Sequence, residues 1–426
     1  MIEKKELEGR YEFYCRHLKE VILPFSMKRA LDLEHGGYYS CFTNDGRTMV
    51  SKNKYMWSQG RFIWIFSKLA GMEEFKPRER EEFRDCAKLG VDFVLEHGFL
   101  KDGRCVFLMD EEGHHLASSP DGEFAGSTFA DCYVASGFAQ YARLTGDRNM
   151  LIKAMELYDR IMGMYETRTF QTVPFYVPEG MKCHLTAMIL CGMHWDYIGM
   201  LRAFSDGREE RIKRRYEGFC REILNDFSQD NHLVLEMMGE DGTPRNRFLG
   251  RYVNTGHTME GMWFICHYAL ENGSMDMIHQ AGLVMEETVS KSWDEVYGGL
   301  RYYMGSDGGT IGGDILDERE HATAIQMEKD CNNKLWWVHT ESLYALLLYA
   351  LTQEDERMWK QFERLEEYVF QTFPNPDPEI GEWIFLRNQD GTPMSSEVGG
   401  RLPIKDPFHT IRNLVLMMEL LKEKSR

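Results

Sequence analysis

The 426-residue sequence has few prolines, no long apolar run and no excess of basic residues. Its 12 prolines leave long stretches that can be helical, because proline breaks a helix when it falls in the interior. No apolar run approaches the ~18 residues of a membrane span, and the charged N-terminal segment lacks the apolar core of a secretory signal. We therefore expect a cytoplasmic globular protein that does not cross a membrane.

Positive charge and cysteine pairs are also scarce. The 50 Lys and Arg against 68 Asp and Glu give a net charge of −18, which argues against nucleic acid or an anionic membrane as the main partner. A small, uncharged or weakly charged molecule is a better candidate for the main partner. The 10 cysteines form no C-x-x-C pair and no His/Cys cluster at zinc spacing, so we expect reduced, buried thiols.

The main pattern in the sequence is helical periodicity. Hydrophobic residues make up 43% of the chain and aromatic residues 13%, which is ample material for a core. Apolar positions recur at i, i+3, i+4 and i+7, the spacing of amphipathic helices. The expected helices cover residues 55–71, 127–146, 149–166, 184–204, 208–226, 257–272, 275–291, 334–352, 354–372 and 407–424, with two more at the N-terminus and near 78–97.

Asp-Gly turns separate several of these helices. Asp45-Gly46, Asp241-Gly242, Asp307-Gly308 and Asp390-Gly391 follow short aromatic or β-branched runs, a pattern typical of hairpins. About twelve helices joined at one end by short hairpins predict an all-α fold, an (α/α)6 barrel with a pocket at the hairpin end. A stacked solenoid is the competing architecture. No linker divides the chain, so we expect one domain, 1–426.

Two histidine segments give the strongest functional signal. His257 and His409 each open a predicted helix, and each precedes a charged residue by three positions, Glu260 and Arg412. Residues at this spacing share one helical face. The pattern predicts an acid–base site at the rim of a cleft. The alternative for each segment is a structural ion pair at a helix end.

Two further segments place charge among aromatic residues. Glu341 lies at the start of a strongly apolar helix, and a buried carboxylate is costly unless it is paired. It could hold an arginine for structure, or orient a histidine or a substrate. Arg61 follows an aromatic run, which implies a buried partner. Tandem tryptophans such as Trp336 and Trp337 are more often core residues than a platform for a sugar ring. No phosphate-binding glycine motif supports nucleotide binding.

Taken together, these segments resemble the N-acylglucosamine 2-epimerase family, which also includes cellobiose 2-epimerases and mannose isomerases. No single segment is specific, but they span nearly the whole chain in the expected order. The matching stretches are HGGY at 35–38, KYMWSQGR at 54–61, GHTME at 256–260 with Trp263, KLWW at 334–337 with Glu341, GEW at 381–383 and FHTIR at 408–412.

The resemblance implies an (α/α)6 barrel in which two histidines flank C2 of an open-chain sugar, and these map onto His257 and His409. It also implies catalytic roles for Arg61, Glu341 and Arg412. Inversion beside a carbonyl needs a base on one face and an acid on the other, and a fixed cation stabilises the charge that develops on the carbonyl oxygen. No metal or redox cofactor is required. The expected substrate contacts are Tyr55, Trp57, His184, Glu260, Trp263, Trp336 and Trp337.

The reaction is therefore expected to interconvert N-acylglucosamine and N-acylmannosamine. Aldose–ketose isomerisation and cellobiose 2-epimerisation remain alternatives, because residues 181–201 depart from the patterns expected of the family. An inverting glycosidase, with two carboxylates ~6.5–9.5 Å apart, and a non-catalytic binding protein belong to other classes. A homodimer is allowed, although the chain has no leucine-zipper heptads.

Overall fold

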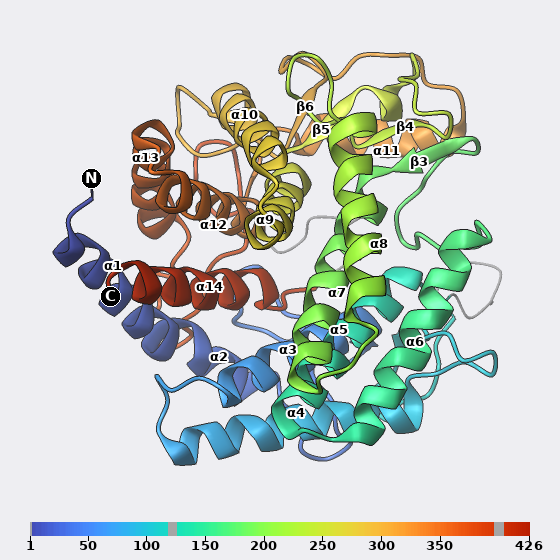
Figure 1. Ribbon diagram of the computed structural model, residues 1–426, viewed down its shortest axis with the longest axis vertical. Helices are drawn as coiled ribbons and strands as arrows, with labels where there is room; N and C mark the ends of the chain where they lie inside the picture. Colours follow the sequence, from blue (N-terminus) through green and yellow to red (C-terminus); the bar gives the residue numbers. More distant parts are fainter. Residues whose placement is uncertain (1, 118–125, 396–403) are drawn as a thin grey trace.

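The computed structural model describes residues 2–117, 126–395 and 404–426 of the chain (Figure 1). Six helices form a closed inner ring in which each contacts the next, and contacts between the last and the first complete the circle. The closure confirms the (α/α)6 barrel and excludes the open solenoid. The inner helices are α3 (Met56–Ala70), α5 (Thr128–Thr145), α7 (His184–Ala203), α9 (Thr255–Asn272), α12 (Trp336–Gln353) and α14 (Phe408–Lys424).

An outer layer of helices covers this ring, each packed on an inner partner. The outer helix α1 (Lys4–His17) continues through the π-helical turn η1 (Leu18–Ile22) into α2 (Leu23–Arg29), and it packs on α14. The other outer helices are α4 (Pro77–His97), α6 (Arg148–Glu166), α8 (Glu209–Glu222) with its π-helical end η2 (Ile223–Phe227), α10 (Met275–Ser292) and α13 (Glu356–Thr372).

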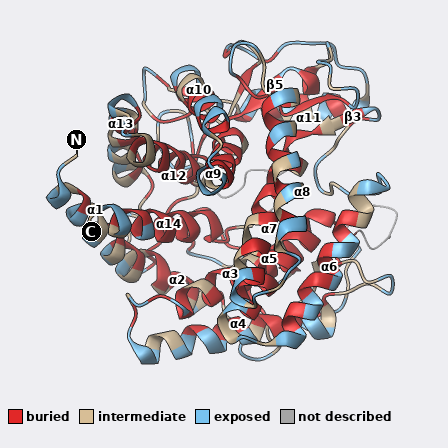
Figure 2. Cartoon of the chain, in the orientation of Figure 1, coloured by how far each residue is buried: buried red, intermediate tan, exposed pale blue. Residues whose placement is uncertain are grey.

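Burial follows the apolar pattern of each layer (Figure 2). The outer helix α13 buries one stripe of side chains, among them Met358, Phe362, Leu365 and Val369, and exposes its charged face. The inner helix α12 is apolar on nearly every side and is buried almost throughout. One connected cluster of buried side chains runs from α1 to α14. A single domain over residues 1–426 stays a prediction.

Small residues allow the closest approach between inner helices. Gly60 on α3 faces α5, where a Cβ atom would overlap the backbone of Tyr133, and Gly137 on α5 faces the carbonyl of Gly60 in return. Any larger residue at either position would push the two helices apart. The two glycines therefore allow α3 and α5 to pack closely, although glycine inside a helix lowers helix propensity.

Four two-stranded antiparallel ladders lie at the N-terminal ends of the inner helices. Four of the strands run directly into α3, α7, α9 and α12, so the ladders mark one end of the barrel. The pairs are β1 (Lys54–Tyr55) with β2 (Leu108–Met109), β3 (Met181–Cys183) with β4 (Met237–Gly239), β5 (Tyr252–Asn254) with β6 (Tyr303–Gly305), and β7 (Lys334–Leu335) with β8 (Leu386–Arg387).

The predicted short hairpins are present as isolated bridges, such as Phe42 with Met49 and Arg387 with Pro393, but the ladders are formed differently. Each ladder joins strands on either side of a helix pair, so the paired strands are far apart in sequence. The Asp-Gly turns themselves are present, and Gly242, Gly308 and Gly391 follow the second strand of their ladders with positive φ. Short-range cues identified these turns but could not reveal a strand partner beyond two intervening helices.

One further helix, α11 (Glu318–Asp330), was not predicted. It lies between β6 and β7 at the ladder end, outside the six pairs. Six of its 13 residues are charged, and only Glu320, Ala324, Met327 and Asp330 are buried. Such a sparse apolar pattern falls below the periodicity by which the other helices were recognised.

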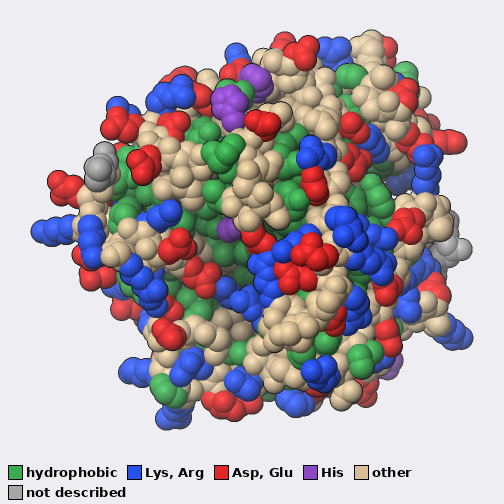
Figure 3. Space-filling view, viewed as in Figure 1, with side chains coloured by type: hydrophobic (Ala, Val, Ile, Leu, Met, Phe, Trp, Pro, Cys, Tyr) green, Lys and Arg blue, Asp and Glu red, His purple; other side chains and the backbone are tan. Residues whose placement is uncertain are grey.

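The surface does not gather its negative charge in one area on the face drawn in Figure 3. Acidic and basic side chains are interspersed there, and hydrophobic side chains show in a central hollow. Eight of the ten cysteines are buried and none is in a disulfide, as expected for thiols that serve as core residues. Within the described ranges, no helix is both long enough and apolar enough to cross a bilayer.

Two buried lysine–aspartate pairs brace the starts of inner helices. Lys54 Nζ lies 2.7 Å from Asp32, just before α3, and Lys334 Nζ lies 3.1 Å from Asp294, just before α12. Burial lowers the pKa of Lys334 to about 8, although Asp294 opposes this shift. Each aspartate also accepts two backbone N–H bonds from the turn that follows it. The same brace thus occurs twice in the barrel.

We expect Lys334→Met to lower the free energy of unfolding by about 3–5 kcal/mol, because it strands the Asp294 carboxylate in the core. Urea denaturation followed by circular dichroism measures the change. Lys329→Met, on the exposed side of α11, is the matched control and should be close to neutral. Equal stability of the two variants would show that the brace is not structural.

Candidate active site

A pocket of about 440 Å³ opens at the ladder end of the barrel. Its lining includes residues from the first two turns of all six inner helices. Predicted site residues on its wall are Trp57 and Arg61 from α3, His257 and Glu260 from α9, Trp336 and Trp337 from α12, and His409 from α14.

His257 is held at the start of α9 by a buried carboxylate. The Asn254 side chain caps the helix by accepting the His257 N–H at 3.2 Å. The imidazole Nδ1 lies 3.0 Å from Glu236 Oε1. A carboxylate can only accept, so Nδ1 carries a proton and Nε2 is the nitrogen left for proton exchange with a ligand.

Glu236 is a functional residue that sequence reasoning missed. It is 2% exposed and also lies 3.5 Å from His184 Nδ1. Burial alone would raise its pKa, but the neighbouring His257 and His184 hold that pKa at about 2. The available signal was one acidic residue inside the apolar run LVLEMMG at 233–239.

His409 has the same arrangement, with Glu341 as its carboxylate. His409 Nδ1 lies 2.7 Å from Glu341 Oε1. Burial, with the nearby charges of Arg61 and Arg412, lowers the pKa of His409 to about 3, and Glu260 only partly offsets this. The imidazole is therefore neutral near pH 7 and can act as a base.

Glu341 connects three inner helices. It is fully buried and accepts bonds from Trp263 Nε1 at 2.7 Å, Arg412 Nη2 at 2.8 Å and Asn413 Nδ2 at 2.7 Å, in addition to His409. Of the two roles considered for Glu341, it performs both: it pairs with an arginine and orients a histidine. The four donors compensate for the loss of its hydration.

Trp337 places the two histidines in one site. Its ring centroid lies 5.3 Å from that of His257 and 5.4 Å from that of His409. Gly256 makes room for this packing, because a Cβ atom there would overlap the Trp337 ring. Both imidazoles therefore stand beside one aromatic ring on the wall of the same pocket.

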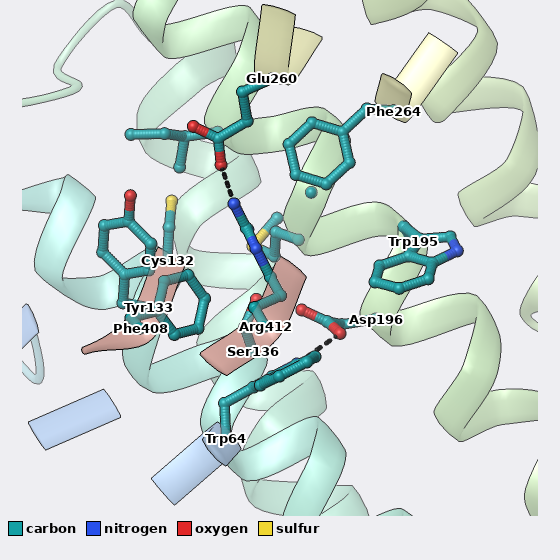
Figure 4. A pocket seen from close by; sticks show the side chains of 13 residues that line it. Trp64, Cys132, Tyr133, Ser136, Trp195, Asp196, Glu260, Phe264, Phe408 and Arg412 are labelled. Atoms are coloured by element: carbon teal, nitrogen blue, oxygen red, sulfur yellow. Dashed lines mark hydrogen bonds and ion pairs between the residues drawn. The ribbon is translucent and has the colours of Figure 1, made fainter. Parts of the chain in front are cut away.

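The two predicted cations differ in position. Arg61 lines the pocket, with its guanidinium 4.1 Å from the Tyr133 ring centroid and Nη1 3.3 Å from Asp406 Oδ2. Arg412 lies behind the residues that line the pocket and is bonded to Glu260 and Glu341. Figure 4 shows its bond to Glu260. Of the two candidates for stabilising a substrate oxygen, the geometry favours Arg61. The position of Arg412 suits a positioning role, and its predicted catalytic role stays a prediction.

Below Arg412 is a separate space of about 20 Å³, large enough for one water molecule. Trp64 and Asp196 lie at one side of it, and Trp64 Nε1 donates to Asp196 at 2.7 Å (Figure 4). Burial raises the pKa of Asp196 to about 6. The Arg412–Glu260 pair borders both this space and, through Glu260, the pocket above.

Among the described residues, one group has ligands close enough together for a metal ion: Glu260, Glu341 and His409. Arg412 Nη2 already bonds both carboxylates and lies 3.5 Å from His409 Nδ1. Its guanidinium supplies the positive charge that a metal would bring, and its bonds use the oxygen atoms that a metal would need.

Three expected substrate contacts lie behind the pocket wall rather than on it. His184 is fully buried against Glu236, and Trp263 is fully buried with its N–H on Glu341. Tyr55 packs against Trp57 and Phe107. In the part of the chain that the structure describes, these residues support others that face the pocket, and their contact with a substrate stays a prediction. Asp406 and Tyr133, which the sequence did not single out, do line it.

The fold and the pocket define the class of protein, a helical-barrel enzyme equipped for acid–base chemistry by two carboxylate-bound imidazoles. Solved structures share this fold. One is a D-mannose isomerase, with a TM-score of 0.75, 15% identity and coverage of 96% of this chain and 97% of that chain. Another is the cellobiose 2-epimerase from Spirochaeta thermophila DSM 6192, with a TM-score of 0.75, 17% identity and coverage of 98% of both chains.

The family follows from the sequence. The model of the N-acylglucosamine 2-epimerase (GlcNAc 2-epimerase) family matches residues 37–410, and the chain belongs to this family. It is 27% identical over 417 residues to the N-acylglucosamine 2-epimerase of Rattus norvegicus, covering 94% of this chain and 89% of the relative.

We expect His409 to stay neutral from pH 8 down to pH 5, because its pKa lies near 3. The 15N chemical shifts of its imidazole should report a protonated Nδ1 and an unprotonated Nε2 over this range. Its folded-state pKa is below the unfolded value of about 6.5, so its contribution to stability is lost as pH falls from there toward 3. A His409 resonance that titrates near pH 6.5 would contradict the assignment.

Proposed function

We propose that the protein interconverts N-acylglucosamine and N-acylmannosamine by moving the proton at C2 of the open-chain sugar. The observation that carries this proposal is the pair His257 and His409, each held at Nδ1 by a buried carboxylate and each on the wall of one pocket. Membership in the family supports the same reaction. The substrate is a small sugar, and the negatively charged, thiol-containing chain supports our proposal of a cytoplasmic location.

The two imidazoles have different electrostatic surroundings, which suggests how the roles divide. His409 is kept neutral by burial beside two arginines, so it serves as the base that takes the C2 proton. His257 lies against Glu236, whose carboxylate stays ionised and stabilises an imidazolium, so it serves as the acid. In the reverse direction the roles exchange.

The step balances without an added reactant. The C2–H bond breaks toward His409 Nε2, and its electron pair forms a C1–C2 double bond as negative charge moves to the C1 oxygen. Arg61 lines the pocket with a fixed positive charge, which is suited to stabilise that oxygen. His257 then returns a proton to C2 from the other face as the C1 carbonyl re-forms, and exchange with water removes the proton from His409 and restores one to His257. The open-chain sugar therefore leaves with C2 inverted.

Aldose–ketose isomerisation is the second candidate, because a D-mannose isomerase shares this fold. It begins with the same proton removal but returns the proton at C1. In deuterated water, proton NMR separates the two reactions. We expect N-acetylmannosamine to give N-acetylglucosamine with deuterium at C2, whereas a ketose product would assign the protein to the isomerases.

We expect His257→Ala and His409→Ala each to lower C2 exchange by roughly 10²- to 10⁴-fold, since each removes a general acid or base. The same NMR assay measures the loss. His114→Ala, in an exposed loop, is the matched control and should keep full activity. Full exchange in His409→Ala would show that His409 is not a catalytic residue.

We expect Glu236→Gln to reduce kcat by roughly 10²- to 10⁴-fold, by analogy with other carboxylates that orient a catalytic imidazole. A carboxamide can donate as well as accept, so it no longer fixes the Nδ1–H form of His257 or stabilises its positive charge. Glu240→Gln, four residues away and exposed, is the control. Unchanged turnover in Glu236→Gln would show that His257 does not need the Glu236 carboxylate for catalysis.

A further inference from the structure

The helix α11 forms one wall of the pocket. It is inserted between β6 and β7, outside the six helix pairs of the barrel. Four of its side chains, Thr323, Gln326, Met327 and Asp330, line the pocket that also contains His257 and His409. Whatever occupies the pocket therefore contacts side chains on which the proton-transfer machinery does not depend.

The start of α11 is fixed by a buried carboxylate. Glu320 is fully buried and accepts bonds from Arg247 Nε at 3.0 Å and Nη2 at 2.8 Å, the Leu249 N–H at 3.0 Å and the Leu316 N–H at 2.9 Å. Four donors on one carboxylate hold the helix at a set position against the barrel. The pocket wall is thus preformed, as specificity requires.

A second contact joins α11 to the loop across from it. Asp317 caps the helix by accepting the Glu320 N–H at 2.8 Å, and it also accepts the Tyr176 hydroxyl at 2.8 Å. Tyr176 and its neighbours Pro174 and Phe175 line the pocket too. This loop and α11 therefore form one connected wall.

The amide of Gln326 has a defined orientation. Its Nε2 donates to Asp330 Oδ2 at 2.6 Å, and Asn333 Nδ2 donates to Asp330 Oδ1 at 2.9 Å. Asp330 is buried, and an ionised carboxylate only accepts, so the NH₂ group of Gln326 must face it. The carbonyl oxygen Oε1 is then the acceptor that this side chain offers to a ligand.

We propose that Gln326 is a specificity residue that accepts a hydrogen bond from the amide N–H of an N-acyl sugar. The inference rests on the proposed function and names the group that the pocket recognises. Buried apolar side chains, Met327 of α11 and Leu249 beside Glu320, belong to the same wall and suit the acyl methyl group. An acceptor beside apolar surface matches an N–H attached to an acyl group better than it matches a hydroxyl.

The test is Gln326→Met, which keeps the length of the side chain but removes the acceptor. For N-acetylmannosamine in the C2-exchange assay, we expect KM to rise about 10-fold, the effect of one lost hydrogen bond. We expect kcat to change little, because the contact is remote from C2 and is made equally in ground and transition states. Gln371→Met, exposed on α13, is the matched control and should leave both constants unchanged.

A second measurement distinguishes recognition from damage to the fold. The preference for N-acetylmannosamine over mannose should fall in Gln326→Met by the same factor as KM rises, while the thermal midpoint stays that of the wild type. An unchanged KM and preference would overturn the role of Gln326. An equal loss toward both sugars would overturn it as well, because it would indicate a general disturbance of the pocket.

A failure of the proposed function can be distinguished from a failure of the inference about Gln326. If the wild-type enzyme exchanges the C2 proton of mannose but of no N-acyl sugar, the N-acyl assignment is wrong before any substitution is made, and the inference about Gln326 falls with it. If the wild type exchanges N-acetylmannosamine and Gln326→Met is indistinguishable from it, only the inference about Gln326 fails.

Discussion

The site depends on the hydrogen bonds and the ion pair that the buried carboxylate of Glu341 accepts. An ionised group without solvent contact must find donors within the protein, and Glu341 finds them on two neighbouring helices, α9 and α14. Because the donors come from both sides, the positions of α9 and α14 relative to α12 are constrained together. The orientation of His409 is thus set by the same contacts that hold this side of the barrel together.

The second histidine is oriented by the same chemistry from a different source. Glu236 comes from the segment just before β4, not from an inner helix, and its backbone N–H bonds the carbonyl of Tyr252 at the start of β5. The ladders therefore do more than connect helices, because they place one of the two orienting carboxylates. Each histidine has a carboxylate at Nδ1, and His409 also lies near the charges of Arg61 and Arg412.

The arginines illustrate how one residue type serves two purposes. Arg412 is enclosed by two carboxylates and the rings of Phe408 and Trp263, so its charge is used within the protein. Arg61 has a single carboxylate partner at a longer distance and stands on the pocket wall, so part of its hydrogen-bonding capacity faces a ligand. Arg61 and Arg412 differ in role because they lie at different depths relative to the pocket, not because of their sequence context.

The sequence by itself determined the helical class and the pairing of helices, because periodicity and Asp-Gly turns are local properties of the chain. It also predicted the acid–base pair, because His257 and His409 each precede a charged residue by three positions. Only the tertiary structure decided that Glu236 orients His257, that Arg412 lies behind the residues that line the pocket, and that Tyr55, Trp263 and His184 lie behind its wall. It also revealed α11, whose few buried positions give no strong period. The physical reason is that burial and partners at long sequence separation arise when distant segments close into a ring, and no local pattern records which segments will meet.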